Sequence, residues 1–269
     1  MYSWKATPSF YLNILPMLID NVSGNYRFLT GIAPYSCGVV AMPGFEIVHA
    51  TLQRPPTYEL GFELIERHLE ASGRPRQALC GIELRLPAPV SFEGFAAFNH
   101  EYQEILSQWG LMVEGRNPIA RTNIAPVVRP PEQPSLYAFS YTVPSEADSP
   151  SFVVAGAGDL DDQTNLSTAA IVRPNETSEE ALREKARTVM DVMQSRLDGL
   201  NVGWSTVTAM DVYTTHPVQP FLLDTMLGPA GDAAVHGIRW HFGHPPIKGL
   251  AFEMDVRGVR QEVRIMVDG

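Results

Sequence analysis

The stretch SFVVAG, residues 151–156, decides the fold because it has a counterpart in the first half of the chain. It is rich in strand-forming residues and ends in glycine, which predicts a β-strand. YRFLTG, residues 26–31, has the same character, and its Gly31 lies 125 residues before Gly156. The repeated pattern predicts that the two halves of the chain share one order of elements.

A helix with a capping residue at its start and a glycine at its end is predicted after each strand. The first spans residues 57–73, with Thr57 as its cap. The second spans residues 177–199, where Thr177 and Glu180 form a capping box. Later elements repeat as well. Each half continues with a β-rich run (78–86 and 205–215), a second helix (92–109 and 219–227) and a further extended segment that begins near Arg121 and near Arg239.

The offset between matching points falls to 118 residues between Arg121 and Arg239, which fits a deletion in the shorter second-half helix. We therefore predict an internal duplication, with domains at residues 1–144 and 145–269. The junction is the proline-flanked segment 144–150. Each domain is predicted to be α+β, a mixed sheet with helices packed on one face.

Composition limits the partners of this chain. Thirty acidic residues against 20 basic give a formal charge of −10, which disfavours binding to the phosphates of nucleic acid. No apolar run approaches the roughly 20 residues that cross a bilayer, so no membrane partner is expected. The predicted partner is a small molecule.

The cysteines and the N-terminus predict a cytoplasmic protein. Cys37 and Cys80 would form at most one disulfide, and both are predicted to be buried apolar residues. The segment after Lys5 is interrupted by Pro8 and Pro16 and does not resemble a signal peptide.

Four short motifs carry a resemblance to a known family. FAAFNHEY (residues 95–102) is similar to a helix of the form F-x-x-x-N-x-x-Y, and PIART (118–122) to a P-A-R-[ST] strand entry. VVAGAGD (153–159) is similar to an SGQ strand, with Ala155 in place of serine, and FEMDV (252–256) to a closing V-E-I-E strand. With these motifs the chain resembles the Rid family, also called the YjgF/YER057c/UK114 family.

The resemblance implies a fold and an activity. It implies two chorismate-mutase-like domains, assembled as in a homotrimer, and hydrolysis of enamines or imines with release of ammonia. A related branch deaminates 2-aminomuconate. Such chemistry requires a cation for the substrate carboxylate, a positioned water and an acid-base group, with no metal and no organic cofactor.

The resemblance also implies the site residues. Arg121 and Arg239 both match the carboxylate-binding arginine, Glu253 the acid-base glutamate and Asn99 the helix asparagine. Ser140 stands where the first half would carry its own glutamate. One hypothesis is a composite site of Arg239, Glu253 and Asn99 of a neighbouring domain. The other is that the first-half site has degenerated and serves assembly.

The histidines near Arg239 do not predict a metal site, because His236, His241 and His244 lack metal-ligand spacing. On a strand, His241 and Arg239 would face the same side. His241 is then either a catalytic proton carrier or a hydrogen-bonded strand histidine. Trp240 would face the opposite layer, as part of the core.

The sequence thus predicts a hydrolase that deaminates a small carboxylate-bearing enamine or imine such as 2-aminomuconate. Its site is predicted to lie in a cleft between domains. Two alternatives stay open. One is a chorismatase-like hydrolase, and the other is a metabolite-binding or assembly module that does not catalyse.

Overall fold

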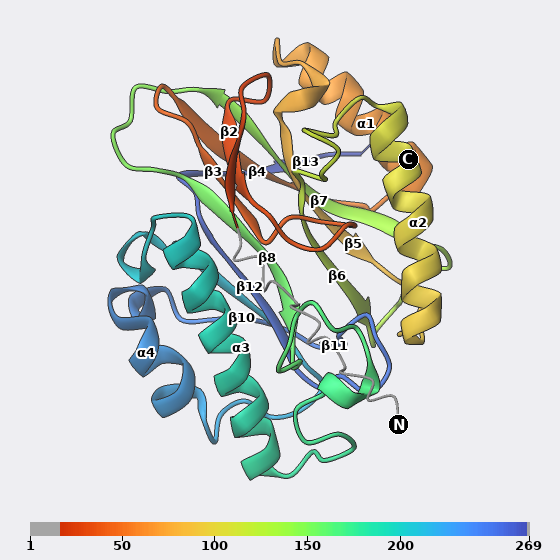
Figure 1. The fold of residues 1–269 in the computed structure, drawn as a ribbon, viewed down its shortest axis with the longest axis vertical. Helices are drawn as coiled ribbons and strands as arrows, with labels where there is room; N and C mark the ends of the chain where they lie inside the picture. The colour runs from red at the N-terminus through yellow and green to blue at the C-terminus, as the bar shows by residue number, and fades with distance from the viewer. Residues whose placement is uncertain (1–16, 268–269) are drawn as a thin grey trace, which may run out of the picture.

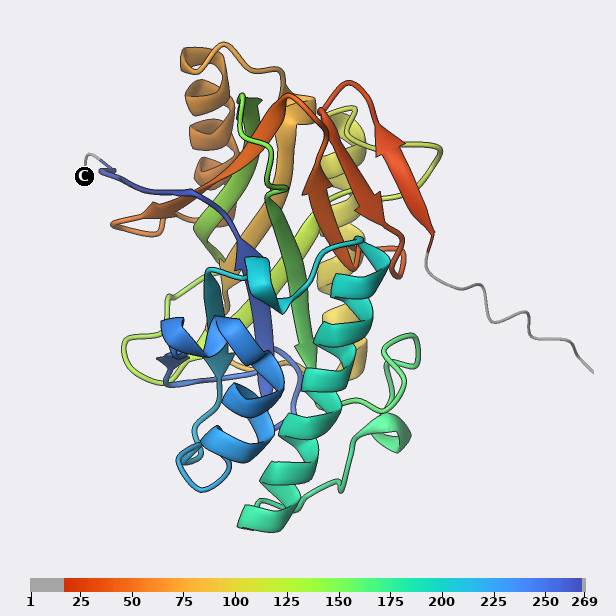
Figure 2. The same cartoon turned by 90° about the vertical axis from the view of Figure 1, so that its left-hand side faces the viewer.

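The computed structural model describes residues 17–267 and consists of two mixed β-sheets that lie face to face. Figure 1 shows α1 and α2 on one flank, α3 and α4 on the opposite flank, and the strands between them. Figure 2 shows the same layers from the side. The molecule is therefore layered as helices, sheet, sheet, helices.

The strands of each sheet are given in spatial order. The seven-stranded sheet contains β1 (Leu18–Asn21), β2 (Tyr26–Leu29), β3 (Gly38–Ala41), β8 (Phe152–Gly158), β12 (Glu253–Gly258), β9 (Ala209–Tyr213) and β10 (Arg239–His241). The six-stranded sheet contains β11 (Gly243–His244), β6 (Ala120–Pro126), β5 (Leu79–Arg85), β7 (Ser135–Pro144), β4 (Phe45–Leu52) and β13 (Gln261–Ile265).

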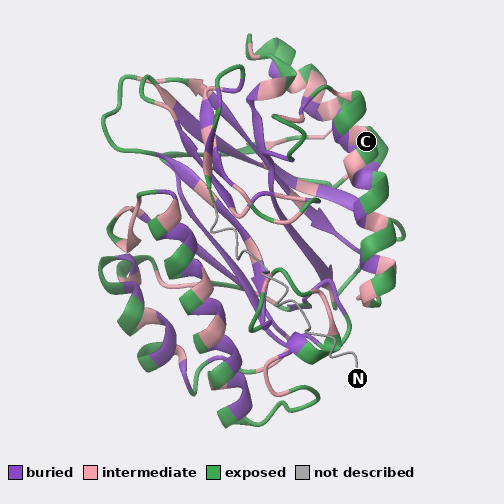
Figure 3. Ribbon diagram, in the orientation of Figure 1, coloured by how far each residue is buried: buried purple, intermediate pink, exposed green. Residues whose placement is uncertain are grey.

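Each sheet buries its outer face under helices. The helices are α1 (Tyr58–Ala71), α2 (Phe92–Gln108), α3 (Glu179–Gly199), a π-helical turn (Leu222–Leu227) and α4 (Gly228–Ala230). Short 3₁₀ turns occur at Arg76–Ala78, Thr168–Ala170, Trp204–Thr206 and Gly231–His236. Ile65 and Leu106 of α1 and α2 pack on the six-stranded sheet. Val189 and Met193 of α3 pack on the seven-stranded sheet. The central strands are mostly buried (Figure 3), whereas the edge strands β10 and β13 are largely exposed.

The predicted helices are confirmed to within one or two residues at most of their ends. Thr57 is the N-cap residue of α1, although its side chain makes no capping bond. Ser178 rather than Thr177 caps α3, because its hydroxyl accepts the Ala181 N–H. The predicted helix at 219–227 is replaced by a π-helical turn and the three residues of α4.

The prediction of two separate Rid-type domains is wrong, because each sheet takes strands from both halves of the chain. β3 pairs with β8, which joins the first half to the seven-stranded sheet. β13 pairs with β4, and β11 with β6, which joins the second half to the six-stranded sheet. These shared sheets do not support the predicted internal duplication. The junction at 144–150 lies between β7 and β8, and the division there stays a prediction.

The space between the two sheets is apolar at one end and polar at the other. Phe28, Val39, Ile47 and Cys80 belong to the apolar end. β12 presents Glu253, Asp255 and Arg257 toward the polar end, while Met254 and Val256 between them pack under α3. This alternation places charged groups inside the molecule.

The remaining expectations have mixed outcomes. Both cysteines are free thiols; Cys80 is buried as predicted, whereas Cys37 is only partly buried. Trp240 is 39% exposed, so its prediction as a core residue is wrong. Lys5, Pro8 and Pro16 lie outside the described residues. Within residues 17–267, no helix is both long and apolar enough to cross a bilayer.

Candidate active site

Arg121 is a buried guanidinium on β6 that faces the start of α2. Its side chain is 3% exposed, and its Nη2 donates a hydrogen bond to Asn99 Oδ1. Four aromatic rings lie 4.6 to 5.6 Å from the guanidinium carbon, and they are those of Tyr35, Phe95, Phe98 and Tyr102. Such ring faces stabilise a cation, while burial lowers the pKa of Arg121.

The second terminal nitrogen of Arg121 has no partner. Within residues 17–267, Nη1 is buried without any hydrogen bond, and both amide atoms of Asn123 are in the same condition. A buried polar group without a partner costs roughly 1–3 kcal/mol. These unpaired groups therefore point to a ligand that supplies acceptors and donors.

Glu253 is the acidic group of the same site. It is the first residue of β12 and is 4% exposed. Its carboxyl makes no hydrogen bond or ion pair to another residue in the described part of the chain. Burial first, and then the neighbouring Asp255, raise the pKa of Glu253 well above its usual value, while Arg196 and Arg121 act in the opposite direction. The carboxyl group is thus held protonated and able to donate a proton.

These groups line one small cavity of about 30 Å³. Its base carries the polar groups of Arg121, Asn123 and Glu253. Its cover is mostly apolar and comes from two segments, with Leu160, Gln163 and Leu166 in one and Pro246, Ile247 and Leu250 in the other. Glu253 and Arg121 therefore meet in one cavity of a single chain.

Two glycines of β8 leave room for the Glu253 carboxyl. A Cβ atom at Gly156 would lie 2.5 Å from Glu253 Oε1 and 2.9 Å from Thr122 Cγ2. A Cβ atom at Gly158 would lie 2.6 Å from Leu250 Cδ1 and 3.8 Å from Glu253 Oε2. The backbone of β8 thus approaches the side chains of the site more closely than a residue with a Cβ atom would allow.

A buried ion pair fixes the start of β12. Lys185 of α3 lies 2.7 Å from Asp159 Oδ2, and both side chains are fully buried. The other oxygen, Asp159 Oδ1, accepts the backbone N–H groups of Ala251 and Phe252 at 2.9 and 3.1 Å. Because Glu253 follows directly, this pair sets the position of its backbone.

Arg239 and His241 do not reach the cavity. They line a separate cleft of about 430 Å³ between the two sheets, which shares no lining residue with the cavity. Arg239 makes a bidentate ion pair with Glu262, at 3.1 and 2.7 Å. The guanidinium that was expected to bind a substrate carboxylate thus already holds a carboxylate of the protein.

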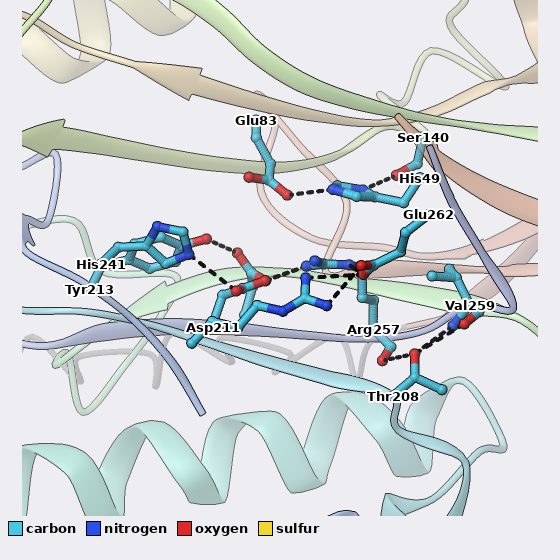
Figure 4. A network of polar contacts seen from close by, with 12 residues as sticks. His49, Glu83, Ser140, Thr208, Asp211, Tyr213, His241, Arg257, Val259 and Glu262 are labelled. Atoms are coloured by element: carbon cyan, nitrogen blue, oxygen red, sulfur yellow. Dashed lines mark hydrogen bonds and ion pairs between the residues drawn. The ribbon is translucent and has the colours of Figure 1, made fainter. Parts of the chain in front are cut away.

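His241 is part of a charged network in this cleft (Figure 4). Its Nε2 lies 3.1 Å from Asp211 Oδ1, and its ring stacks on Tyr213 at 5.0 Å. Burial alone would raise the pKa of Asp211, but the hydrogen bond with His241 and the charge of Arg257 lower it. This is the geometry of a hydrogen-bonded strand histidine, so the role of His241 as a proton carrier stays a prediction.

The opposite wall of the cleft carries His49 and Glu83 (Figure 4). His49 Nδ1 lies 3.1 Å from Ser140 Oγ, and its Nε2 lies 3.5 Å from Glu83 Oε1. Burial, followed by the nearby charge of Arg257, lowers the pKa of His49 to about 4, which makes it neutral at physiological pH. Ser140 therefore pairs with His49 and holds no place in the cavity.

The structure groups the site residues differently from the hypothesis of a composite site. The structure brings Glu253 together with Arg121 and Asn99 of the same chain, not with Arg239 and a neighbour's Asn99. Sequence reasoning missed Tyr35 and Asn123 altogether. The alternation of Asn123 with Arg121 on one strand could have indicated Asn123, but no local signal marks Tyr35.

No cluster of three metal-ligating side chains occurs within residues 17–267. The three histidines around Arg239 accordingly form no such group there. The expectation that the reaction needs no metal and no organic cofactor stays a prediction.

Two of the three comparisons with known proteins match deaminases of aminomuconates. A family profile described as "2-aminomuconate deaminase CnbZ" matches residues 18–263. The 2-amino-5-chloromuconate deaminase of Comamonas testosteroni is 41% identical over 241 residues, which cover 89% of this chain and 95% of that protein. A chorismatase crystal structure aligns with a TM-score of 0.44 at 9% identity, over 90% of this chain and 78% of the other, a similarity below the level that identifies a shared fold.

The resemblance to the Rid family is thereby overturned. The profile that covers nearly the whole chain is that of CnbZ, and it is not a Rid profile. The four short motifs are similar to Rid motifs in residue type, but this similarity does not make the chain a member of the Rid family.

Proposed function

This chain belongs to the 2-aminomuconate deaminase CnbZ family, and from that premise we propose that it hydrolyses the amino group of a 2-aminomuconate in the Arg121–Glu253 cavity. The observation that carries the proposal is the buried, unpartnered Nη1 of Arg121 in one cavity with a buried carboxyl group. A substrate carboxylate supplies the acceptor that Nη1 lacks.

Arg121 orients the substrate by its carboxylate. A guanidinium keeps its charge at any working pH and binds a carboxylate through two N–H groups. Asn99 and the aromatic rings fix the guanidinium plane, so the bound carboxylate is fixed as well. The unpaired amide of Asn123 adds a donor and an acceptor beside it.

Glu253 serves as the acid and base. Its protonated carboxyl donates a proton to a carbon of the dienamine, and the C–N bond becomes an iminium. The carboxylate then takes a proton from the water that attacks the iminium carbon, which forms the C–O bond and restores the protonated carboxyl group. In the last step Glu253 protonates the amine and the C–N bond breaks. The departing ammonia takes the hydroxyl proton of the intermediate, and a 2-oxo dicarboxylate remains. One water is consumed, and one ammonia is released.

The cavity of about 30 Å³ has room for about two water molecules. A six-carbon dicarboxylate therefore binds only when the covering segments, residues 160–166 and 246–250, move outward. Leu166 and Leu250 contribute to the apolar cluster that closes this side. Once the segments close again, they exclude bulk water and strengthen the contact of Arg121 with the substrate.

The test is steady-state deamination of 2-aminomuconate, followed by loss of diene absorbance and by release of ammonia. Glu253→Gln removes the proton donor and should lower kcat by about 10²–10⁴-fold. Arg121→Met should raise KM by about 10–100-fold, since a charged hydrogen bond contributes roughly 1.5–3 kcal/mol. Glu146→Gln, on the exposed β7–β8 loop, is the matched control and should leave both constants unchanged.

Several outcomes would contradict the proposal. If Glu253→Gln retains wild-type kcat, the acid-base role of Glu253 is wrong. If the wild type binds the dicarboxylate in calorimetry but releases no ammonia, the alternative of a metabolite-binding module holds. Turnover of chorismate in the same assay format would favour the chorismatase-like alternative.

Assembly and location belong to the same proposal. A homotrimer and a cytoplasmic location were expected from the sequence, and both stay predictions. Sedimentation of the purified protein would decide the first. The cavity has all its polar groups from one chain, so we expect activity to persist in a monomeric variant.

A further inference from the structure

Three cavities between the sheets share lining residues and form one polar seam. The active-site cavity and a small cavity of about 10 Å³ both touch Arg121. The small cavity and the charged cleft of about 430 Å³ both touch Glu83 and Arg257. Polar side chains therefore connect the buried site to an open cleft on the other side of the molecule.

Asp255 occupies the middle of this seam. On β12, Glu253 and Asp255 lie on the same face, roughly 6.6 Å apart along the strand. Asp255 is 3% exposed and lines the small cavity, whose volume of about 10 Å³ is close to what one water occupies. The small cavity is thus large enough for one water between Asp255 and Glu83, and Glu253 follows on the other side of Asp255 along β12.

Glu83 connects the small cavity to solvent. It lines both the small cavity and the cleft, and its side chain is 12% exposed. Figure 4 shows Glu83 and His49 on one wall of the cleft, across from Asp211 and Arg257 on the other. Of the carboxyl groups that line the cleft, Glu83 is the one that also lines the small cavity with Asp255.

Burial favours a proton on Asp255, whereas a hydrogen bond from Tyr213 and the charge of Arg257 favour its ionised form. The Tyr213 hydroxyl donates to Asp255 Oδ2 at 2.8 Å, and Arg257 Nη1 lies 3.8 Å from Oδ1. Burial, followed by the charges of Glu83 and Asp211, raises the pKa of Asp255 well above its usual value. The titratable and charged groups that face the two carboxyls are His49 on β4, Arg85 on β5, Asp211 and Tyr213 on β9, and Glu253 and Arg257 on β12.

We propose that Asp255 and Glu83 form a proton relay that recharges Glu253 from the charged cleft. The proposal rests on the function proposed above. Glu253 gives its proton to the amine, and the C–N bond breaks. The departing ammonia takes the hydroxyl proton of the intermediate and leaves as ammonium, so Glu253 ends the cycle ionised. Asp255 then passes its proton to Glu253 along the shared face of β12, and Glu83 returns one proton from the cleft to Asp255 across the small cavity. One solvent proton is consumed in each turnover.

The relay predicts a burst. Glu253 is protonated before the reaction starts, so a variant without the relay should complete its first turnover at the wild-type rate. Asp255→Asn, which keeps an acceptor for Tyr213, and Glu83→Gln should each release one ammonia per active chain and then turn over about tenfold more slowly or worse. The measurement is rapid-quench analysis of ammonia in the first turnovers.

A second readout and a control separate the relay from a structural role. In Glu83→Ala, a small weak acid such as formic acid should raise the slow rate in proportion to its concentration. Glu262 lines the same cleft but not the small cavity, so the Glu262→Gln variant should show no burst.

Two results would overturn the relay. In one, the relay variants turn over at the wild-type rate throughout. In the other, their first turnover is slowed as much as the later ones, which indicates a structural role. Either leaves the deaminase function intact. A wild type that releases no ammonia would instead remove the proposed function, and the relay with it.

Discussion

At the scale of single residues, the buried cations divide into paired and unpaired ones. Lys185 is fully buried and has Asp159 and the Val172 carbonyl as partners. Arg257 is held by Asp211 and Glu262. Arg121, in contrast, meets one amide oxygen and aromatic rings, and no carboxylate of the described residues pairs with it. Since a buried charge is stable only when paired, the partner that we propose for Arg121 is the substrate carboxylate.

The raised pKa of Glu253 predicts how stability depends on pH. Below the ordinary value of 4.5, Glu253 is protonated in both the folded and unfolded chain. As the pH rises above 4.5, the unfolded chain loses this proton while the folded chain retains it, so Glu253 lowers the free energy of unfolding until its folded pKa is reached. Each pKa unit of difference amounts to about 1.4 kcal/mol. Glu253→Gln should therefore be more stable than the wild type, increasingly so as the pH rises above 4.5 toward the folded-state pKa of Glu253.

Urea unfolding at several pH values measures this difference. The exposed Glu146→Gln variant should follow the wild type at every pH. A constant difference between Glu253→Gln and the wild type across this range would mean that Glu253 ionises normally in the folded protein.

At the scale of elements, β8 is shaped by the carboxyl group that it faces. Gly156→Ala places a methyl group 2.5 Å from Glu253 Oε1, so the carboxyl must move. We expect kcat to fall by about 100-fold, the size of effect that a displacement of about 1 Å produces, with a much smaller loss of stability. Gly203→Ala is the matched control, because its new methyl would meet no atom within 4 Å. Equal activity of the two variants would show that β8 does not set the position of Glu253.

Most helices were predictable from the sequence, whereas the strand pairing was not. Capping residues and 3.6-residue periodicity are local signals, and they placed α1, α2 and α3 correctly. The partner of a strand depends on residues far away in the sequence. β3 looked like part of a first-half sheet, yet it pairs with β8, more than 100 residues later. Alternation tells which face of a strand is buried but not which strand lies beside it.

At the scale of the whole molecule, the same limit explains the partial prediction of the site. The structure places the predicted site residues Arg121 and Glu253 in one cavity, with Asn99 hydrogen-bonded to Arg121, while their roles stay predictions. Arg239 was grouped with Glu253 because both were assigned to a self-contained second half, but it lines the separate cleft. In the folded chain β6 of the six-stranded sheet lies against β8 of the other sheet, so the arginine beside Glu253 comes from the first half.

The shared sheets also predict that neither half folds alone. A chain of residues 1–144 retains β3 and β4 but loses β8 and β13, which pair with them. A chain of residues 145–269 exposes the matching edges, and its buried Glu253 loses the wall that Arg121 supplies. Two new sheet edges and an uncovered polar seam leave too little burial to offset the loss of chain entropy.

Each half expressed alone should therefore show no cooperative thermal transition by circular dichroism, and the two halves together should recover both a transition and deaminase activity. A cooperative transition in either isolated half would show that the division at residues 144 and 145 separates true domains. That result would also mean that the pairing of strands from different halves, β3 with β8 and β4 with β13, is not what holds the molecule together.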